Sequence, residues 1–233
     1  MGCSMDYNYV KNATLNVFIE CNIHSFPINC SDILKHYGVS LFSYSSLSSE
    51  LREYSSKYSD DAYTYKDKIF YNDDMLCGRI RFSLMHELGH ILLNHTELQT
   101  YDMEQEANNF ASNLLAPRMA IHYAKCKNEN DVSKLFSITQ EAALYAFNDY
   151  KRWHRWTTYH KMNSLDKKLY NHFYNNEQNK FIYSIKRCIY CGSKIYNSGD
   201  EDCHKCTTPT NLYSSNERSD FLLAESYWLY GGL

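Results

Sequence analysis

Two histidines and a glutamate with the spacing H-E-x-x-H are the residues best suited to chemistry in this chain: His86, Glu87 and His90. On an α-helix, His90 lies about 40° and Glu87 about 100° from His86, so both imidazoles and the carboxylate share one face. Two imidazoles one turn apart can hold Zn²⁺, and a carboxylate beside them can act as a general base on a water at an open coordination position. The spacing therefore predicts the geometry of a zincin, with His86 and His90 as ligands and Glu87 as the base.

The residues around this motif have the pattern of a helix that is half buried, from about residue 77 to residue 94. Arg79 and Ser83 project on the face of the two histidines. The opposite face carries the apolar side chains Ile80, Leu84, Leu88, Ile91 and Leu92. One face is thus suited to a metal and the other to a core. In the same projection His95 falls on the apolar side, and we expect it to be a structural histidine.

A second helix is expected over residues 102–115, ending before Pro117. Glu104 lies on the stripe of small and apolar side chains that can pack against a neighbouring helix, whereas Glu106 projects about 200° away, on the solvent side. Glu104 is therefore the favoured third metal ligand and Glu106 the alternative. Asn108, about 40° from Glu104, is expected to orient a ligand through a hydrogen bond, or to be an interfacial polar residue with a local hydrogen bond.

The nine cysteines fall into a scattered group of five and a patterned group of four. The patterned group is Cys188, Cys191, Cys203 and Cys206, spaced C-x₂-C-x₁₁-C-x₂-C. Four thiolates in two pairs are typical of a closed structural Zn²⁺ site, with a zinc-ribbon hairpin expected within residues 193–202 and a turn at 197–200. The scattered cysteines are expected to be small buried hydrophobes, and the odd total suits a reducing compartment.

The segments before the first motif are expected to position it. A weak amphipathic helix is predicted at 15–20, a short helix at 32–38, a strand at 39–44, a surface helix within 45–59 (with disorder as the alternative), and a hairpin of strands 62–65 and 68–71.

Two segments after the second helix raise the question of nucleic-acid binding. Residues 131–147 have a helix-turn-helix pattern, but no Arg or Lys occurs from Gln140 to Tyr150, so packing against the peptidase domain is favoured over DNA reading. Residues 151–187 hold nine Lys and Arg against two acidic residues, interleaved with aromatic side chains. A solvated helical linker is the favoured interpretation there, and direct nucleic-acid binding is the less favoured one.

Length and composition limit the number of domains and the classes of partner that the chain can have. With 233 residues and 44% hydrophobic residues, the chain can form one large domain, or one medium domain and a small module. It has no apolar run long enough to span a membrane and no apolar signal-peptide core at its start, so we expect a cytoplasmic protein without membrane contact. A net charge of −3 gives no general attraction to nucleic acid.

The expected fold class is α+β. A zincin-like metallopeptidase domain, mostly helical with a small sheet, is predicted over residues 1–150, followed by a basic aromatic helical linker over 151–187 and a zinc-ribbon module over 188–233.

Both helices resemble the motifs of the ImmA/IrrE family of metallopeptidases. The resemblance rests on residues 79–93, which contain H-E-L-G-H, on residues 104–117, E-Q-E-A-N-N-F-A-S-N-L-L-A-P, and on the strand at 68–72. It covers about residues 35–150.

This resemblance implies a small zincin-type peptidase with Zn²⁺ on His86, His90 and a glutamate of the second helix, for which Mn²⁺ is a second candidate ion. It also implies a substrate: a helix-turn-helix transcriptional repressor of a mobile element or prophage, against which the peptidase acts as an antirepressor. The function expected is zinc-dependent endopeptidase cleavage of such a repressor. The alternative is a non-cleaving antirepressor that binds its partner and keeps the zinc sites as structure.

Overall fold

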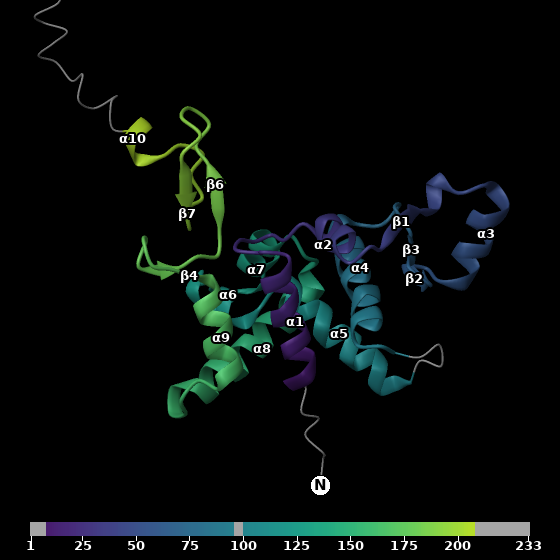
Figure 1. The fold of residues 1–233 in the computed structure, drawn as a ribbon, viewed down its shortest axis with the longest axis horizontal. Coiled ribbons are helices and arrows are strands. Elements are labelled where there is room, and N and C mark those ends of the chain that lie inside the picture. The colour runs from purple at the N-terminus through teal and green to yellow at the C-terminus, as the bar shows by residue number, and fades with distance from the viewer. Residues whose placement is uncertain (1–7, 96–99, 208–233) are drawn as a thin grey trace, which may run out of the picture. The chain divides into compact units, whose positions relative to one another are not determined.

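The computed structural model describes residues 8–95 and 100–207, which form two units divided between Tyr183 and Ser184 (Figure 1). The helices of the first unit are α1 (Asn8–Glu20), α2 (Cys30–His36), η1 (Tyr44–Ser46), α3 (Ser49–Tyr58), α4 (Cys77–Leu92), α5 (Tyr101–Leu115), α6 (Arg118–Tyr123), α7 (Glu129–Phe136), α8 (Gln140–Tyr159) and α9 (Ser164–Phe173). Its strands are β1 (Ser40–Ser43), β2 (Ala62–Tyr65), β3 (Lys68–Tyr71), β4 (Tyr174–Asn175) and β5 (Lys180–Phe181). The second unit contains β6 (Ile185–Arg187), β7 (Lys194–Tyr196) and α10 (His204–Thr207).

The described chain is mostly helical with small sheets, which confirms the predicted α+β class. The hairpin and the two motif helices lie where the sequence predicts them, and the serine-rich segment forms α3 rather than disorder. Helix α1 is longer than the predicted segment 15–20, because the chain before it continues the same buried stripe through Val10 and Thr14. Within residues 8–95 and 100–207, none of the helices has both the length and the apolar character that a bilayer crossing requires.

A three-stranded sheet of order β1-β3-β2 leads into α4, with β1 parallel and β2 antiparallel to β3. Lys66 takes a left-handed φ of 58° in the tight turn of the β2–β3 hairpin. Thr64 is paired directly with Ile69, which is fully buried, so both side chains lie on the same face of the sheet. This face packs toward α4, and the sheet therefore carries Thr64 to the helix that holds the H-E-x-x-H motif.

Helices α4 and α5 pack side by side through a core that includes Leu88 and Phe110 (Figure 1). They approach closely at Gly89, where a Cβ atom would lie 3.1 Å from Cδ1 of Phe110 and 3.2 Å from Cα of Ala107. Thr100 begins α5 by accepting a hydrogen bond from the N–H of Met103. The small residues at this interface let the backbones approach, and that approach sets the distance between the two motifs.

Helix α8 runs through residue 150, so the segment predicted as a basic linker begins inside a helix of the first unit. Trp153 is buried, and its Nε1–H donates to Oδ2 of Asp166, whose other oxygen accepts from Arg118. At least this aromatic residue of the segment is therefore used for packing between α6, α8 and α9.

The hairpin of the second unit is not the one that the sequence predicts. Strand β6 pairs with β7 across the first cysteine pair, Ile185 opposite Tyr196, rather than forming a hairpin within residues 193–202. Gly192, with a φ of +71°, reverses the chain just after Cys191. The tight turn at the first C-x₂-C pair is thus itself the hairpin connection.

The first turn of α4 lies against the connection between α7 and α8, and this contact can be tested. A Cβ on Gly78 would lie 2.7 Å from the backbone nitrogen of Thr139 and 2.9 Å from the carbonyl carbon of Ile138. We expect Gly78→Ala to lower the free energy of unfolding by roughly 1–3 kcal/mol, because backbone atoms must move to admit the methyl group. Urea denaturation measures this.

Leu76→Ala is the matched control, since Leu76 lies two residues away and is 78% exposed. We expect it to change stability by less than about 0.5 kcal/mol. Equal denaturation midpoints for Gly78→Ala and the unaltered protein would contradict the contact.

Candidate functional site

Three candidate metal-binding side chains converge between α4 and α5. The Nε2 atoms of His86 and His90 lie 3.0 Å apart. The two carboxylate oxygens of Glu104 lie 3.3 Å from these nitrogens, one from each. The donor atoms of all three residues fall within 4.8 Å of one another. The tertiary structure therefore brings together the three residues that the sequence predicts as ligands of a catalytic metal.

The outward-facing ring nitrogens of both histidines have partners. Nδ1 of His86 lies 3.0 Å from Oδ1 of Asn108, and Nδ1 of His90 lies 2.9 Å from Nδ1 of His95. A proton on each Nδ1 leaves the Nε2 lone pairs directed at Glu104. Asn108 thus makes the contact expected of a residue that orients a ligand.

Electrostatics keep these imidazoles neutral. Burial lowers the pKa of His90 to about 4, with the neighbouring His86 and His95 adding to the effect. Burial also lowers the pKa of His86, against the opposing influence of Glu104. Two neutral imidazoles and a carboxylate form a donor set that suits a divalent ion such as Zn²⁺. The residues present therefore fit a metal.

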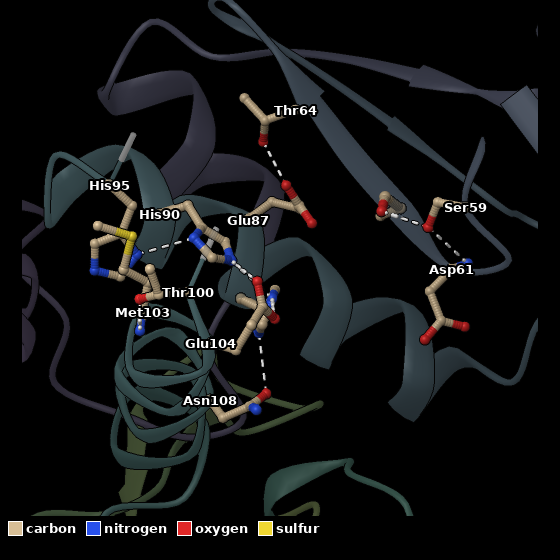
Figure 2. A network of polar contacts seen from close by, with 12 residues as sticks. Ser59, Asp61, Thr64, Glu87, His90, His95, Thr100, Met103, Glu104 and Asn108 are labelled. Atoms are coloured by element: carbon tan, nitrogen blue, oxygen red, sulfur yellow. Dashed lines mark hydrogen bonds and ion pairs between the residues drawn. The ribbon is translucent and has the colours of Figure 1, made fainter. Parts of the chain in front are cut away.

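Glu87 lies beside this cluster but is not one of its members. It is only 7% exposed, and its Oε2 accepts a hydrogen bond of 2.6 Å from Oγ1 of Thr64 (Figure 2). Burial raises the pKa of Glu87 to about 7, although the hydrogen bond from Thr64 lowers it. A carboxylate with a pKa near neutrality can both accept and return a proton.

A cleft of about 890 Å³ opens onto the cluster. Its walls come from the end of α3 and the start of β2, from α4 and α5, and from the first half of α8. Residues that line it include His86, Glu87, Glu104, Arg79, Asp61, Glu141, Tyr145 and Asp149. The start of α8, where the helix-turn-helix pattern would place DNA-reading residues, contributes to the cleft wall. This placement agrees with the expectation from the sequence that residues 131–147 pack against the domain rather than read DNA.

The helical projection is wrong for His95 and Glu106. Helix α4 ends at Leu92, and Asn94 takes a left-handed φ of 54°, so His95 turns back toward His90 instead of continuing around the apolar face. Nε2 of His95 lies 3.0 Å from Oε2 of Glu106, which is partly buried rather than on the solvent side. Glu106 is therefore occupied with His95, and Glu104 is the acidic residue that contacts the two motif histidines.

The second unit holds a separate cluster, formed by the sulfur atoms of the four patterned cysteines, all within 4.8 Å of one another: Cys188, Cys191, Cys203 and Cys206. The N–H of Cys203 donates to Sγ of Cys188 at 3.3 Å. The pKa of Cys191 is lowered to about 6, mainly by its hydrogen bonds with Ser193. A set of four sulfur donors fits the zinc-ribbon module that the spacing predicts.

Residues 35–148 match the family model Peptidase_M78, described as an IrrE N-terminal-like domain. This part of the chain belongs to the Peptidase_M78 family. The match confirms the resemblance drawn from the two motif helices, and it covers nearly the same residues. A metallopeptidase-type or IrrE-like regulatory domain follows from the family, and the family implies a metal cofactor.

One solved structure that the chain matches is described as a Mycobacterium tuberculosis transcriptional regulator, with 12% sequence identity and a TM-score of 0.40. The match covers 82% of this chain and 56% of that protein, so the chain spans a little over half the length of its structural neighbour. No curated protein matches the sequence.

The sequence did not point to Thr64 or to the pairing of His95 with Glu106. Thr64 is an ordinary strand residue in a hairpin, and its contact with Glu87 joins residues 23 positions apart. Arg79, predicted on the polar face of the Peptidase_M78 helix, lies there and pairs with Asp61 at 2.6 Å. The alternation of side chains along β2 predicts that Thr64 lies on the same face as Ala62, which is buried. It does not predict that Thr64 contacts Glu87.

The two clusters should bind metal independently. We expect the purified protein to bind about one Zn²⁺ at each cluster, because each offers a complete set of donors. His90→Ala should lose only the ion of the Peptidase_M78 site, and Cys203→Ser only the ion of the ribbon. Elemental analysis after gel filtration measures both. A His90→Ala protein that retains the full metal content of the unaltered protein would contradict the first assignment.

Proposed function

We propose that this protein is a zinc-dependent endopeptidase that hydrolyses a peptide bond in a protein substrate, with His86, His90 and Glu104 as metal ligands. The observation that carries the proposal is Glu87. This carboxylate is buried, lines the cleft, and lies beside the donor set without belonging to it. Burial of such a group is costly unless it serves a purpose or is well paired, and a site that served only as structure would gain little from it.

A zinc ion held by these three residues would supply Lewis acidity, polarising the scissile carbonyl and making water more acidic. The chain itself supplies the proton transfers. Glu87 takes a proton from the attacking water and then passes it to the nitrogen of the leaving amine. Since Oε2 of Glu87 accepts the Thr64 hydroxyl, the other carboxylate oxygen is the one that carries the proton.

The substrate is a protein segment that enters the cleft between α5 and α8. We take it to be a helix-turn-helix transcriptional repressor of a mobile element or prophage, as the Peptidase_M78 family membership and the earlier resemblance suggest. A volume of about 890 Å³ accommodates several residues of an extended peptide. The alternative is a regulator that binds such a repressor without cutting it, and the variants below separate the two.

Glu87→Gln should abolish cleavage and preserve metal binding. The amide has nearly the same shape as the carboxylate but cannot accept the proton, so we expect kcat to fall by about 10²–10⁴-fold. The measurement is cleavage of the helix-turn-helix protein encoded beside this chain, incubated with purified protein and Zn²⁺ or Mn²⁺. Glu50→Gln, at an exposed position of α3, is the matched control and should cleave at the normal rate.

Cleavage by Glu87→Gln at the rate of the unaltered protein would exclude this mechanism. Tight binding of the repressor by both proteins, with cleavage by neither, would establish the non-cleaving alternative.

Thr64→Val should lower kcat by about 10-fold with little change in KM, because outer residues that orient a catalytic group typically contribute on that scale. Valine fills the same space without the hydroxyl that holds Glu87. Thr64→Ser keeps that hydroxyl and should restore most of the rate. A Thr64→Val protein with the kcat of the unaltered protein would contradict a role for this hydrogen bond in turnover.

A further inference from the structure

A continuous line of hydrogen-bonding groups runs from His90 away from the cleft. Nδ1 of His90 lies 2.9 Å from Nδ1 of His95, and Nε2 of His95 lies 3.0 Å from Oε2 of Glu106 (Figure 2 shows the first contact). The His95 side chain is 5% exposed and that of Glu106 is 22% exposed. None of this is needed to complete the donor set of His86, His90 and Glu104.

With Glu106 ionised and His95 neutral, the three groups allow one consistent arrangement of protons. A carboxylate only accepts, so Nε2 of His95 carries the proton and donates to Glu106. Neutral His95 then has an unprotonated Nδ1, which can only accept, and so Nδ1–H of His90 is the donor between the two rings. His90 in this tautomer presents the lone pair of Nε2 toward His86 and Glu104. Glu106 thus determines the tautomer of His90 through His95.

The backbone holds His95 in place for this contact. Asn94 takes a left-handed φ of 54°, and the N–H of His95 donates to the carbonyl of His90 at 3.0 Å. Glu106 comes from the neighbouring helix α5, on which Glu104 lies about half a turn earlier. The two acidic residues of one helix therefore approach His90 from its two ring nitrogens, one directly and the other through His95.

We propose that His95 and Glu106 are positioning residues that fix the tautomer and ring orientation of His90 and so raise the metal affinity of the site. The proposal rests on His90 being a metal ligand, as in the proposed function, but not on peptide cleavage. Groups that orient a ligating histidine in this way typically contribute about 10–100-fold to metal affinity. A pair that only joined the ends of α4 and α5 would change stability and leave the affinity alone.

The test is a double-mutant cycle on the full chain, with Zn²⁺ affinity measured by competition with a chromophoric chelator. His95→Phe keeps a ring of similar size but removes both nitrogens, and should weaken binding by about 10–100-fold. Glu106→Gln should weaken it less, because the amide can still meet His95. In the His95→Phe background, Glu106→Gln should have no further effect, since the contact through which it acts is gone.

Two controls separate positioning from a general loss of structure. Asp102→Asn, at an exposed position on the same helix, should leave the affinity unchanged. The four-cysteine cluster is an internal reference, because its affinity should be the same in every variant. His95→Gln retains an acceptor for Nδ1–H of His90 and should bind zinc more tightly than His95→Phe, even if both melt at the same temperature.

Nitrogen-15 NMR of labelled histidines gives a second readout. The protein without metal should show the His90 proton on Nδ1, and His95→Phe should show a mixture of tautomers.

Affinities of His95→Phe and Glu106→Gln within about 2-fold of the unaltered protein, well below the range for such groups, would overturn the proposal. So would independent, additive effects in the double variant. A protein that binds no ion at His86 and His90 would overturn both this proposal and the proposed function, whereas absence of cleavage alone bears only on the latter.

Discussion

The close packing of α4 against α5 at Gly89 is the constraint on which the candidate site depends. A methyl group there would press against Cα of Ala107 and the ring of Phe110 at 3.1–3.2 Å, so any larger residue would push the helices apart. Glu104 lies one turn before Ala107 on the same helix, and its oxygens reach 3.3 Å from both motif histidines only because the backbones are this close. The arrangement of the three candidate ligands is therefore a consequence of a small-residue helix contact in the core.

Around that contact, the buried polar groups form a network in which each member limits the freedom of the next. Thr64 on β2 holds Glu87, Asn108 on α5 holds His86, and His95 after α4 holds His90. In a buried site, a polar group without a hydrogen-bond partner lowers the stability of the folded state, whereas a paired group is held in one orientation. The three contacts come from three different elements, so the folded domain, and not α4 alone, determines where the side chains of the candidate site point.

The two candidate metal centres differ in the way that their chemistry requires. The Peptidase_M78 site combines three donors with a cleft and a nearby carboxylate, an arrangement with room for a substrate. The ribbon combines four sulfur donors on a knuckle hairpin between β6 and β7, an arrangement that closes the coordination of one ion and holds a small unit together.

Much of the site could be predicted from the sequence, because the relevant geometry is local. The spacing of His86, Glu87 and His90 determines their common face through the helical repeat alone. The helical projection also favours Glu104 over Glu106, but for a wrong reason, because the side chain of Glu106 is 22% exposed and that of Glu104 is 37% exposed. The α+β class and the family follow from two motifs of this kind.

The tertiary structure decided the rest. The partner of Glu87 is a strand residue that only the packing of the sheet on α4 brings near. The pairing of His95 with Glu106 depends on the left-handed turn at Asn94, where the helix ends and a helical projection ceases to apply. Contacts between elements, and the point at which an element stops, are set by packing of the whole domain, which periodicity within one segment does not contain.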